Sequence, residues 1–135
     1  MDLNRNYLDW GRRNFKLNGL DADAHDWIRA DTIDFIEQHP EERVYDQVIV
    51  DPPTFSNSKS TERDWEVQRD HVWLLNKIAQ LVTPGGVIYF SNNYRRFKLD
   101  EDGLEGMTVR DISKQTVPED FANKRTHRCW LLTVD

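Results

Sequence analysis

The sequence lacks the features that would place it outside the ordinary soluble proteins. It has a single cysteine, Cys129, so no internal disulfide can form, which fits a reducing cytoplasm. No apolar run approaches the roughly 20 residues of a membrane helix, and the first residues do not form a signal peptide. The chain of 135 residues is long enough for one domain and too short for two. We expect one cytoplasmic domain over residues 1–135, with no membrane contact and no metal site.

The chain also lacks a positive charge excess. Its net charge of −6 argues against nucleic-acid binding by this part alone. The acid is concentrated in residues 21–51, which hold ten acidic and two basic side chains. Either this stretch is a solvated face, or some of its carboxylates hold a polar ligand; the composition leaves both interpretations open.

The apolar pattern alternates between helix and strand periods. Leu3, Tyr7, Trp10 and Leu17 form one stripe of an amphipathic helix that Asn18-Gly19 ends. Helices are expected over residues 2–18, 32–38 and 62–82. Strands are expected over residues 25–30, 45–50, 87–90, 107–116 and 129–134. This alternation predicts a three-layer α/β fold with a mostly parallel sheet.

Ligands of such sheets bind outside the carboxyl ends of the strands. The polar residues there are Asp31-Thr32, Asp51-Pro52-Pro53 and Ser91-Asn92-Asn93. The second group continues as Thr54-Phe55. Two prolines fix the backbone and remove two N–H donors, which leaves carbonyl oxygens, a carboxylate and an aromatic ring. These groups suit a flipped base, although a simple strand-ending turn would show the same residues.

The stretch from Val48 to Pro53, then a helix, then Thr83-Pro84-Gly85-Gly86 before the next strand, resembles class I S-adenosylmethionine-dependent methyltransferases, which have a Rossmann-like fold. The resemblance implies that the Asp51 loop lies between cofactor and target base. It also implies that Asp31, with Thr32 beside it, binds the cofactor's adenine, and that Asp2 binds its ribose. Carboxylates suit both positions because an exocyclic amine and a diol are donors.

A closer resemblance covers nearly the whole chain. The sequence resembles the C-terminal half of the bifunctional K/L family of large-subunit ribosomal RNA methyltransferases in Tyr7-Leu8-Asp9-Trp10, residues 14–19, Asp51 to Lys59, Gln68-Arg69-Asp70-His71, Phe90-Ser91-Asn92-Asn93 and Cys129-Trp130-Leu131-Leu132. The family implies methylation of guanine N7 in 23S ribosomal RNA, with S-adenosylmethionine as cofactor. The residues assigned to the reaction are Asp51, Pro52, Pro53 and Phe55. Those assigned to the cofactor are Asp2, Asp31, Thr32 and Asp51. Those assigned to the substrate are Thr54, Ser56, Asn57, Lys59, Asn92 and Arg95.

Arg95 belongs to a basic cluster with Arg96 and Lys98, and His127 to another with Lys124, Arg125 and Arg128. Each cluster is either a set of phosphate or base contacts or a solvated loop. For His71, in the long predicted helix, we expect a surface or capping role. The tryptophans are expected to be core or interface anchors, but Trp65, like Phe97, is also a candidate for base stacking.

The family's first strand and Gly-rich loop are absent, so the chain is expected to be an N-terminally truncated methyltransferase domain. In the family's sheet order, 3-2-1-4-5-7-6, strand four then has an open edge. We hypothesise that the chain closes this gap by dimerising or by pairing strands three and four. Ribosomal RNA would be held mainly by parts of the parent protein that are not in this sequence.

Three alternatives stay open. Cytosine C5 methylation needs a thiolate, and Cys129 lies within a predicted strand instead of in a pocket loop. Methylation of an exocyclic amino group of adenine or guanine would use the Asp51 loop equally well. The third alternative is a fragment without catalytic activity.

Overall fold

The structure is a computed structural model that describes residues 1–39, 43–57, 64–121 and 127–135. It divides into two compact units, Met1–Pro40 and Glu41–Asp135. Each unit has its own internal packing, and the single domain over residues 1–135 stays a proposal.

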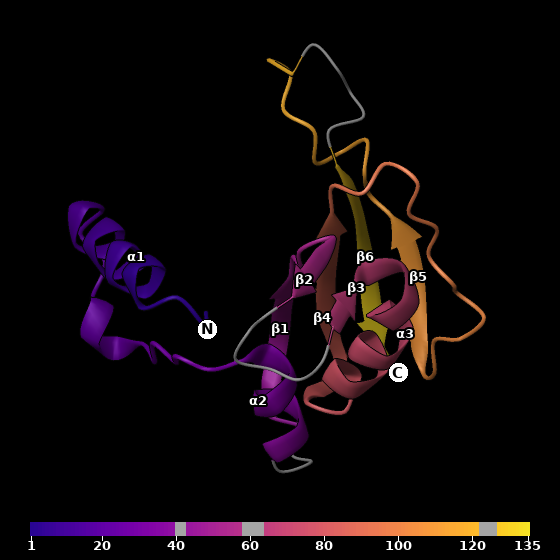
Figure 1. Cartoon of the computed structure of the whole chain (residues 1–135), viewed down its shortest axis with the longest axis horizontal. Coiled ribbons are helices and arrows are strands. Elements are labelled where there is room, and N and C mark those ends of the chain that lie inside the picture. Colours follow the sequence, from indigo (N-terminus) through magenta and orange to yellow (C-terminus); the bar gives the residue numbers. More distant parts are fainter. Residues whose placement is uncertain (40–42, 58–63, 122–126) are drawn as a thin grey trace. The chain divides into compact units, whose positions relative to one another are not determined.

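The Met1–Pro40 unit holds helix α1 (Arg5–Leu17), the short 3-10 helix η1 (Ala22–Ala24) and helix α2 (Thr32–Gln38) (Figure 1). Helix α1 begins after Asn4, whose side chain accepts a hydrogen bond from the N–H of Asn6 at 2.9 Å. The chain leaves α1 through Gly19, whose φ of +70° is the expected left-handed conformation. Helix α2 has the bounds that the sequence predicts.

Trp27 organises this first unit. Its indole N–H donates to the carbonyl of Ala22 at 2.8 Å, and its ring meets that of Phe15 edge to face, with centroids 5.0 Å apart. A Cβ atom at Gly11 would lie 2.6 Å from the Trp27 ring. Glycine at this position therefore lets α1 approach the indole.

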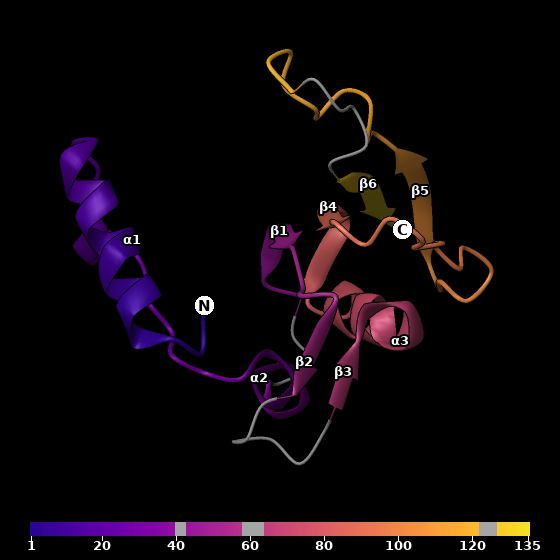
Figure 2. The ribbon, with the colours of Figure 1, turned by 45° about the horizontal axis from the view of Figure 1, so that its top comes forward.

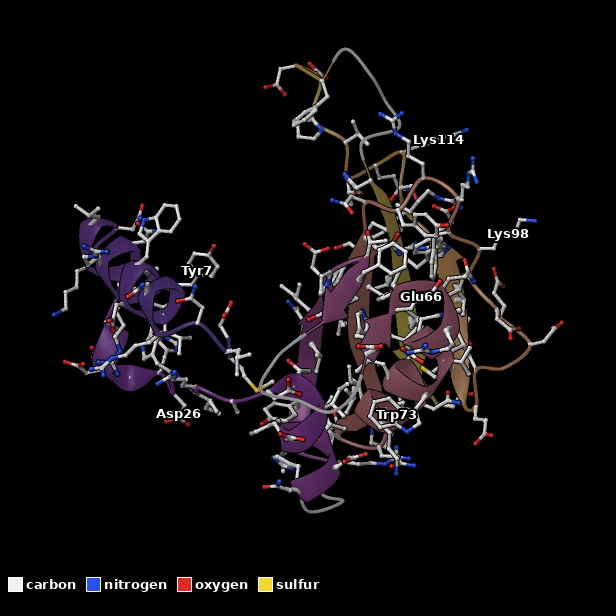
Figure 3. The ribbon with its side chains drawn as sticks, in the orientation of Figure 1. Tyr7, Asp26, Glu66, Trp73, Lys98 and Lys114 are labelled. Carbon is white, nitrogen blue, oxygen red and sulfur yellow. The ribbon has the colours of Figure 1, made fainter. Side chains whose placement is uncertain are left out.

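The predicted apolar stripe of α1 is not its packed face. Tyr7, Trp10 and Leu17 are exposed, and Leu8 is the buried residue of the helix. Tyr7 projects from α1 in Figure 3. The strand expected over residues 25–30 is reduced to one parallel bridge between Asp2 and Arg29, supported by a hydrogen bond from the Asp2 N–H to the carbonyl of Ile28 at 3.1 Å. Asp2 is the only residue that pairs with this segment in the described part of the chain, so no continuous ladder forms.

The Glu41–Asp135 unit is built on a four-stranded sheet. Its strands are β1 (Tyr45–Val50), β4 (Val82–Asn92), β6 (Arg128–Val134) and β5 (Met107–Asp111), in the order β1-β4-β6-β5. β1 and β4 are parallel, whereas the β4–β6 and β6–β5 pairs are antiparallel, so the sheet is mixed and not mostly parallel. This order matches the 4-5-7-6 section of the expected sheet, and the Rossmann-like α/β fold class is confirmed.

Helix α3 (Val67–Ala79) lies against one face of this sheet (Figures 1 and 2). Their shared core contains Leu74, Leu75 and Ile78 from the helix, and Ile88, Phe90 and Leu132 from the sheet. None of the helices in the described ranges is long and apolar enough to cross a membrane.

The helix predicted over residues 62–82 is shorter in the structure because other elements take both of its ends. Strand β3 (Asp64–Glu66) precedes it and pairs with β2 (Phe55–Asn57) as a separate antiparallel hairpin. The Asp70 carboxylate accepts the N–H of Glu66 at 2.9 Å, which fixes the start of the helix. Residues 83–86, expected as a turn, belong to the long strand β4.

The expected surface role of His71 is wrong, because its side chain is 2% exposed. Nδ1 lies 3.0 Å from the carbonyl oxygen of Val67, and Nε2 accepts the N–H of Asp100 at 3.1 Å. The ring packs edge to face on Phe97, with centroids 4.8 Å apart. Phe97 is itself buried, so it belongs to the core and is not free to stack on a base.

Candidate functional site

A pocket with a volume of about 880 Å³ lies where β1 and β4 end and β6 begins. Strands β1 and β4 are parallel, so their carboxyl ends lie at the same edge of the sheet. The pocket is at this edge, where the fold predicts a ligand. Its walls come from three segments. They are Asp51, Pro52, Pro53, Thr54 and Phe55 after β1, then Ser91, Asn92 and Asn93 at the end of β4, then Thr116, His127 and Cys129.

Two hydrogen bonds join the first two walls. The hydroxyl of Ser91 donates to the Asp51 carboxylate at 2.9 Å, and the hydroxyl of Thr54 donates to the side-chain oxygen of Asn93 at 3.2 Å. Because β1 and β4 are neighbours in the sheet, the loop after each strand can reach the other. The Asp51 carboxylate is thereby oriented through one oxygen, while its other oxygen accepts no hydrogen bond from the described residues.

Hydrogen bonds from Trp65 in the β2–β3 hairpin and from Val67 at the start of α3 also fix the loop after β1. Trp65 is 8% exposed, and its indole N–H donates to the carbonyl of Pro53 at 2.8 Å. The carbonyl of Thr54 accepts the N–H of Val67 at 3.0 Å. Trp65 is therefore an anchor and not a stacking platform. These two carbonyls are already used, so fewer of the loop's acceptors remain for a base than the sequence predicts.

The aromatic ring of the loop is available. Phe55 is 60% exposed, and its ring meets that of Tyr94 edge to face with centroids 6.2 Å apart. A ring with this much exposed surface can stack on a planar ligand. Phe55 is thus accessible for the stacking role that the sequence assigns to it, and that role stays a prediction.

Asn92 brings an unpaired donor to the pocket. Its side chain is 1% exposed, and its oxygen accepts the N–H of Tyr94 at 3.1 Å, which sets the orientation of the amide. The amide nitrogen has no hydrogen-bond partner among the described residues. An unpaired buried donor costs about 1–3 kcal/mol, and functional sites are where native proteins retain such groups.

The third wall contains the only cysteine. Burial, chiefly, together with the nearby Asp51 and Asp111 carboxylates, raises the pKa of the Cys129 thiol above its usual value, although a hydrogen bond with Thr116 acts in the opposite direction. A raised pKa reduces the thiolate fraction, and the thiolate is the nucleophile that cytosine C5 methylation requires. The local chemistry therefore disfavours that alternative, even though Cys129 lies in the pocket.

Three of the predicted substrate residues lie outside the pocket lining. Ser56 and Asn57 are in β2, paired with Trp65 and Asp64. Arg95 is exposed just after Tyr94. Lys59, also predicted, falls outside the described residues. Their role in substrate binding stays a prediction.

The predicted cofactor residues Asp2, Asp31 and Thr32 belong to the Met1–Pro40 unit. Asp31 caps helix α2, where its Oδ1 accepts the N–H groups of Ile33 at 2.9 Å and Asp34 at 3.4 Å. Asp2 accepts the N–H of Asn4 at 2.7 Å through Oδ1. Both aspartates use Oδ1 locally, which leaves Oδ2 as the acceptor for a ligand.

The sequence placed Ser91 and Asn93 at the ligand edge of the sheet without a specific role, assigned no role in the pocket to Thr116 and Cys129, and placed His127 in a basic patch. Antiparallel pairing puts Cys129 opposite Ser91, so the start of β6 meets the end of β4. This pairing is long-range and has no local sequence signal. Of the patch, Arg128 is used internally, against Asp111 at 3.4 Å and over the Trp130 ring at 4.9 Å. Lys124 and Arg125 fall outside the described residues.

No protein-family model matches the chain. It is 47% identical, over 96% of its length, to "Ribosomal RNA large subunit methyltransferase K" of Neisseria meningitidis serogroup B, and 46% identical over its full length to "Ribosomal RNA large subunit methyltransferase K/L" of Pseudoalteromonas atlantica. The chain spans 37% of the first relative and 19% of the second.

A solved structure supports the fold independently. The crystal structure of SMU.776, described as a methyltransferase in complex with SAH, matches 98% of this chain with a TM-score of 0.80 at 22% identity, and the match spans 37% of that protein. At this identity the likeness shows the fold alone. The identities of 46–47% over nearly all of its length show that the chain belongs, as a partial region, to the family of ribosomal RNA large subunit methyltransferases K and K/L.

Proposed function

We propose that this chain forms the base pocket, and part of the cofactor site, of an enzyme that methylates N7 of a guanine in 23S ribosomal RNA. The observation that carries the proposal is the pocket itself: an oriented carboxylate, an exposed aromatic ring and an unpaired amide donor converge at the carboxyl edge of a methyltransferase sheet. The names of the relatives support ribosomal RNA as the substrate class.

The donor set fits S-adenosylmethionine, which would supply an electrophilic methyl carbon when bound. The free oxygens of Asp2 and Asp31 can accept from a ribose diol and an adenine amino group, and Thr32 adds a hydroxyl beside Asp31. Asp51 lines the pocket as a carboxylate. We propose that Asp2, Asp31, Thr32 and Asp51 bind and orient the cofactor, whose methionine end is cationic at sulfur.

Guanine N7 as the acceptor agrees with how the pocket side chains are used. N7 has a lone pair and no proton, so alignment is needed more than a general base. In the pocket, the carboxylate of Asp51 is bonded to Ser91, and His127 is bonded to Thr116. We propose that Phe55 stacks on the base, that Pro52 and Pro53 fix the loop beside the reacting atoms, and that Thr54 and Asn92 contact the base. We assign Ser56, Asn57, Lys59 and Arg95 to contacts with flanking RNA. A cytoplasmic location follows from the proposed substrate.

The experiment is to incubate the chain with S-adenosylmethionine and unmodified large-subunit ribosomal RNA, digest the RNA, and analyse the nucleosides by mass spectrometry with chromatographic standards. We expect 7-methylguanosine. N2-methylguanosine or N6-methyladenosine would instead support methylation of an amino group. Methylated nucleosides from a longer relative but none from this chain would identify an inactive fragment.

Cofactor binding is testable through Asp31. Asp31→Ala would remove both the ligand contact and the cap of α2, and a lost cap alone costs about 1 kcal/mol. Asp31→Ser retains a capping side chain but shortens its reach to a ligand. In calorimetric titration with S-adenosylhomocysteine, we expect the serine variant to bind about tenfold more weakly, the loss of roughly one hydrogen bond to a charged group. Equal affinities of variant and wild type would exclude Asp31 from the cofactor site.

We also propose that the isolated chain self-associates through β1. This strand pairs only with β4 in the described sheet, and Ile49 on it is 72% exposed. The alternative, pairing between residues 25–30 and β1, stays a prediction. A strictly monomeric elution profile with matching light scattering would contradict self-association.

A further inference from the structure

The third wall of the pocket holds a hydrogen-bonded pair that the proposed reaction does not yet use. His127 Nε2 lies 2.9 Å from the Thr116 hydroxyl oxygen, and both residues line the pocket. The walls are neighbours, because Cys129 pairs with Ser91, whose hydroxyl donates to the Asp51 carboxylate. A ligand in the pocket can therefore meet Asp51 as well as Thr116 and His127.

The surroundings of Thr116 decide which nitrogen of His127 carries the proton. The hydroxyl oxygen also lies 3.2 Å from the carbonyl oxygen of Ile112 and 3.3 Å from that of Ser113. A carbonyl can only accept, and a hydroxyl has one hydrogen. If that hydrogen goes to a carbonyl, His127 donates Nε2–H to Thr116, and two hydrogen bonds form. If it goes to His127, only that bond forms, because neither carbonyl has a hydrogen to give; the Cys129 thiol can donate to the Thr116 oxygen in both cases and does not alter the difference.

The arrangement with two bonds is favoured by the additional hydrogen bond, which contributes about 1 kcal/mol. It fixes neutral His127 with its proton on Nε2 and leaves Nδ1 as an acceptor. This polarity follows from contacts within the protein, before any ligand binds. It complements Asn92 in the same pocket, whose free amide nitrogen is a donor.

We propose that His127 is a specificity-determining residue whose Nδ1 accepts a hydrogen bond from a donor on the Watson–Crick edge of guanine, N1–H or the N2 amino group. The inference rests on the proposed function. An acceptor at this position discriminates between purines, because adenine N1 carries no hydrogen. Thr116 is a positioning residue, since it acts by holding the tautomer and the ring orientation of His127.

The tautomer is measurable without any activity. Nitrogen-15 NMR of the imidazole groups should show His127 protonated at Nε2 and unprotonated at Nδ1 in the wild type near neutral pH. Thr116→Ser keeps the hydroxyl and should leave this pattern unchanged. Thr116→Val has nearly the same shape without the hydroxyl and should give a mixture of both tautomers. A wild-type signal protonated at Nδ1 would overturn the proposal.

Kinetics tests the contact with the base. His127→Ala should raise KM for large-subunit ribosomal RNA about tenfold with little change in kcat, because a contact of equal strength in ground and transition states affects KM. His127→Asn places an amide oxygen near the position of Nδ1 and should restore most of the affinity. A residue with only a structural role would not show this rescue.

Failure of the proposed function and failure of the inference about His127 give different results. If the wild type transfers no methyl group to guanine, the proposed function falls and this inference falls with it. If the wild type is active and His127→Ala leaves KM unchanged, or lowers kcat alone, only the inference about His127 is overturned.

Discussion

Replacing His71 with alanine should destabilise the Glu41–Asp135 unit by about 3–4 kcal/mol, the largest stability effect that we expect from one substitution. The imidazole fills a fully packed position between α3 and the sheet, against Phe90 and Phe97. Truncation of a large buried side chain costs roughly 2–5 kcal/mol through lost contacts and the remaining cavity. The Asp100 N–H additionally loses its acceptor.

The loss of stability should be visible both in the global unfolding of the unit and at one backbone amide, that of Asp100. Urea unfolding followed by tryptophan fluorescence should show a lower midpoint with an unchanged slope. In hydrogen exchange, the Asp100 amide should lose protection, since its hydrogen bond to Nε2 is gone. The matched control is Trp73→Ala on the same helix, because Trp73 is 36% exposed (Figure 3). Equal losses for the two variants would contradict the role of His71 as a buried connector.

His71 also illustrates what the sequence could not reveal. Next to Asp70 in a helical pattern, a histidine is expected at the surface, and nothing local indicates that Asp100 will donate to it. Two other α3 side chains make similar contacts: Gln68 bonds both backbone groups of Lys98, and Asn76 bonds the backbone of Gly103 and Glu105. Polar side chains of α3 therefore position the segment after β4. Neither hydrophobic periodicity nor helix propensity predicts such long-range hydrogen bonds.

Local signals predicted the parts of the fold that local physics controls. The bounds of α2 and β1 agree with expectation, because Asp31 and Pro40 bracket the helix and Asp51-Pro52-Pro53 ends the strand. The β2–β3 hairpin was missed because residues 54–66 are mostly polar and each of its strands has only three residues, too few to show an apolar alternation. The strand over residues 25–30 was overestimated because a strand signal gives a ladder only where a neighbour pairs with it.

In the candidate site, too, the parts set by local sequence were predicted and the part set by long-range pairing was not. The walls contributed by Asp51 and Asn92 follow their strands directly, so strand prediction was enough to find them. The wall of Thr116, His127 and Cys129 depends on β6 pairing antiparallel with β4, a pairing between segments distant in the chain. Charge patterning instead placed His127 in a basic patch. Only the sheet order brings it to the carboxyl edge of β1 and β4.

Replacing Asp51 with asparagine should lower kcat for methyl transfer to ribosomal RNA by about 10²–10³-fold, if the proposed function holds. Methylation at N7 leaves a positive charge on the base, and a fixed carboxylate beside it stabilises that charge as it develops. Loss of one such electrostatic group costs roughly 3–4 kcal/mol in the transition state. Ser91→Ala keeps the carboxylate but removes the hydroxyl that orients it at 2.9 Å, so a smaller decrease of about tenfold is expected.

The chain offers a closely matched control on the same strand. Asp46 also accepts a hydroxyl hydrogen bond from β4, that of Thr83 at 3.0 Å, but it lies near the amino end of β1, away from the pocket. Asp46→Asn therefore changes the same charge and the same kind of bond without touching the site. Its rate should equal that of the wild type when initial rates are measured with labelled cofactor. If Asp46→Asn and Asp51→Asn lost activity equally, the effect of Asp51 would be one of net charge or folding, and its place in the reaction would have to be abandoned.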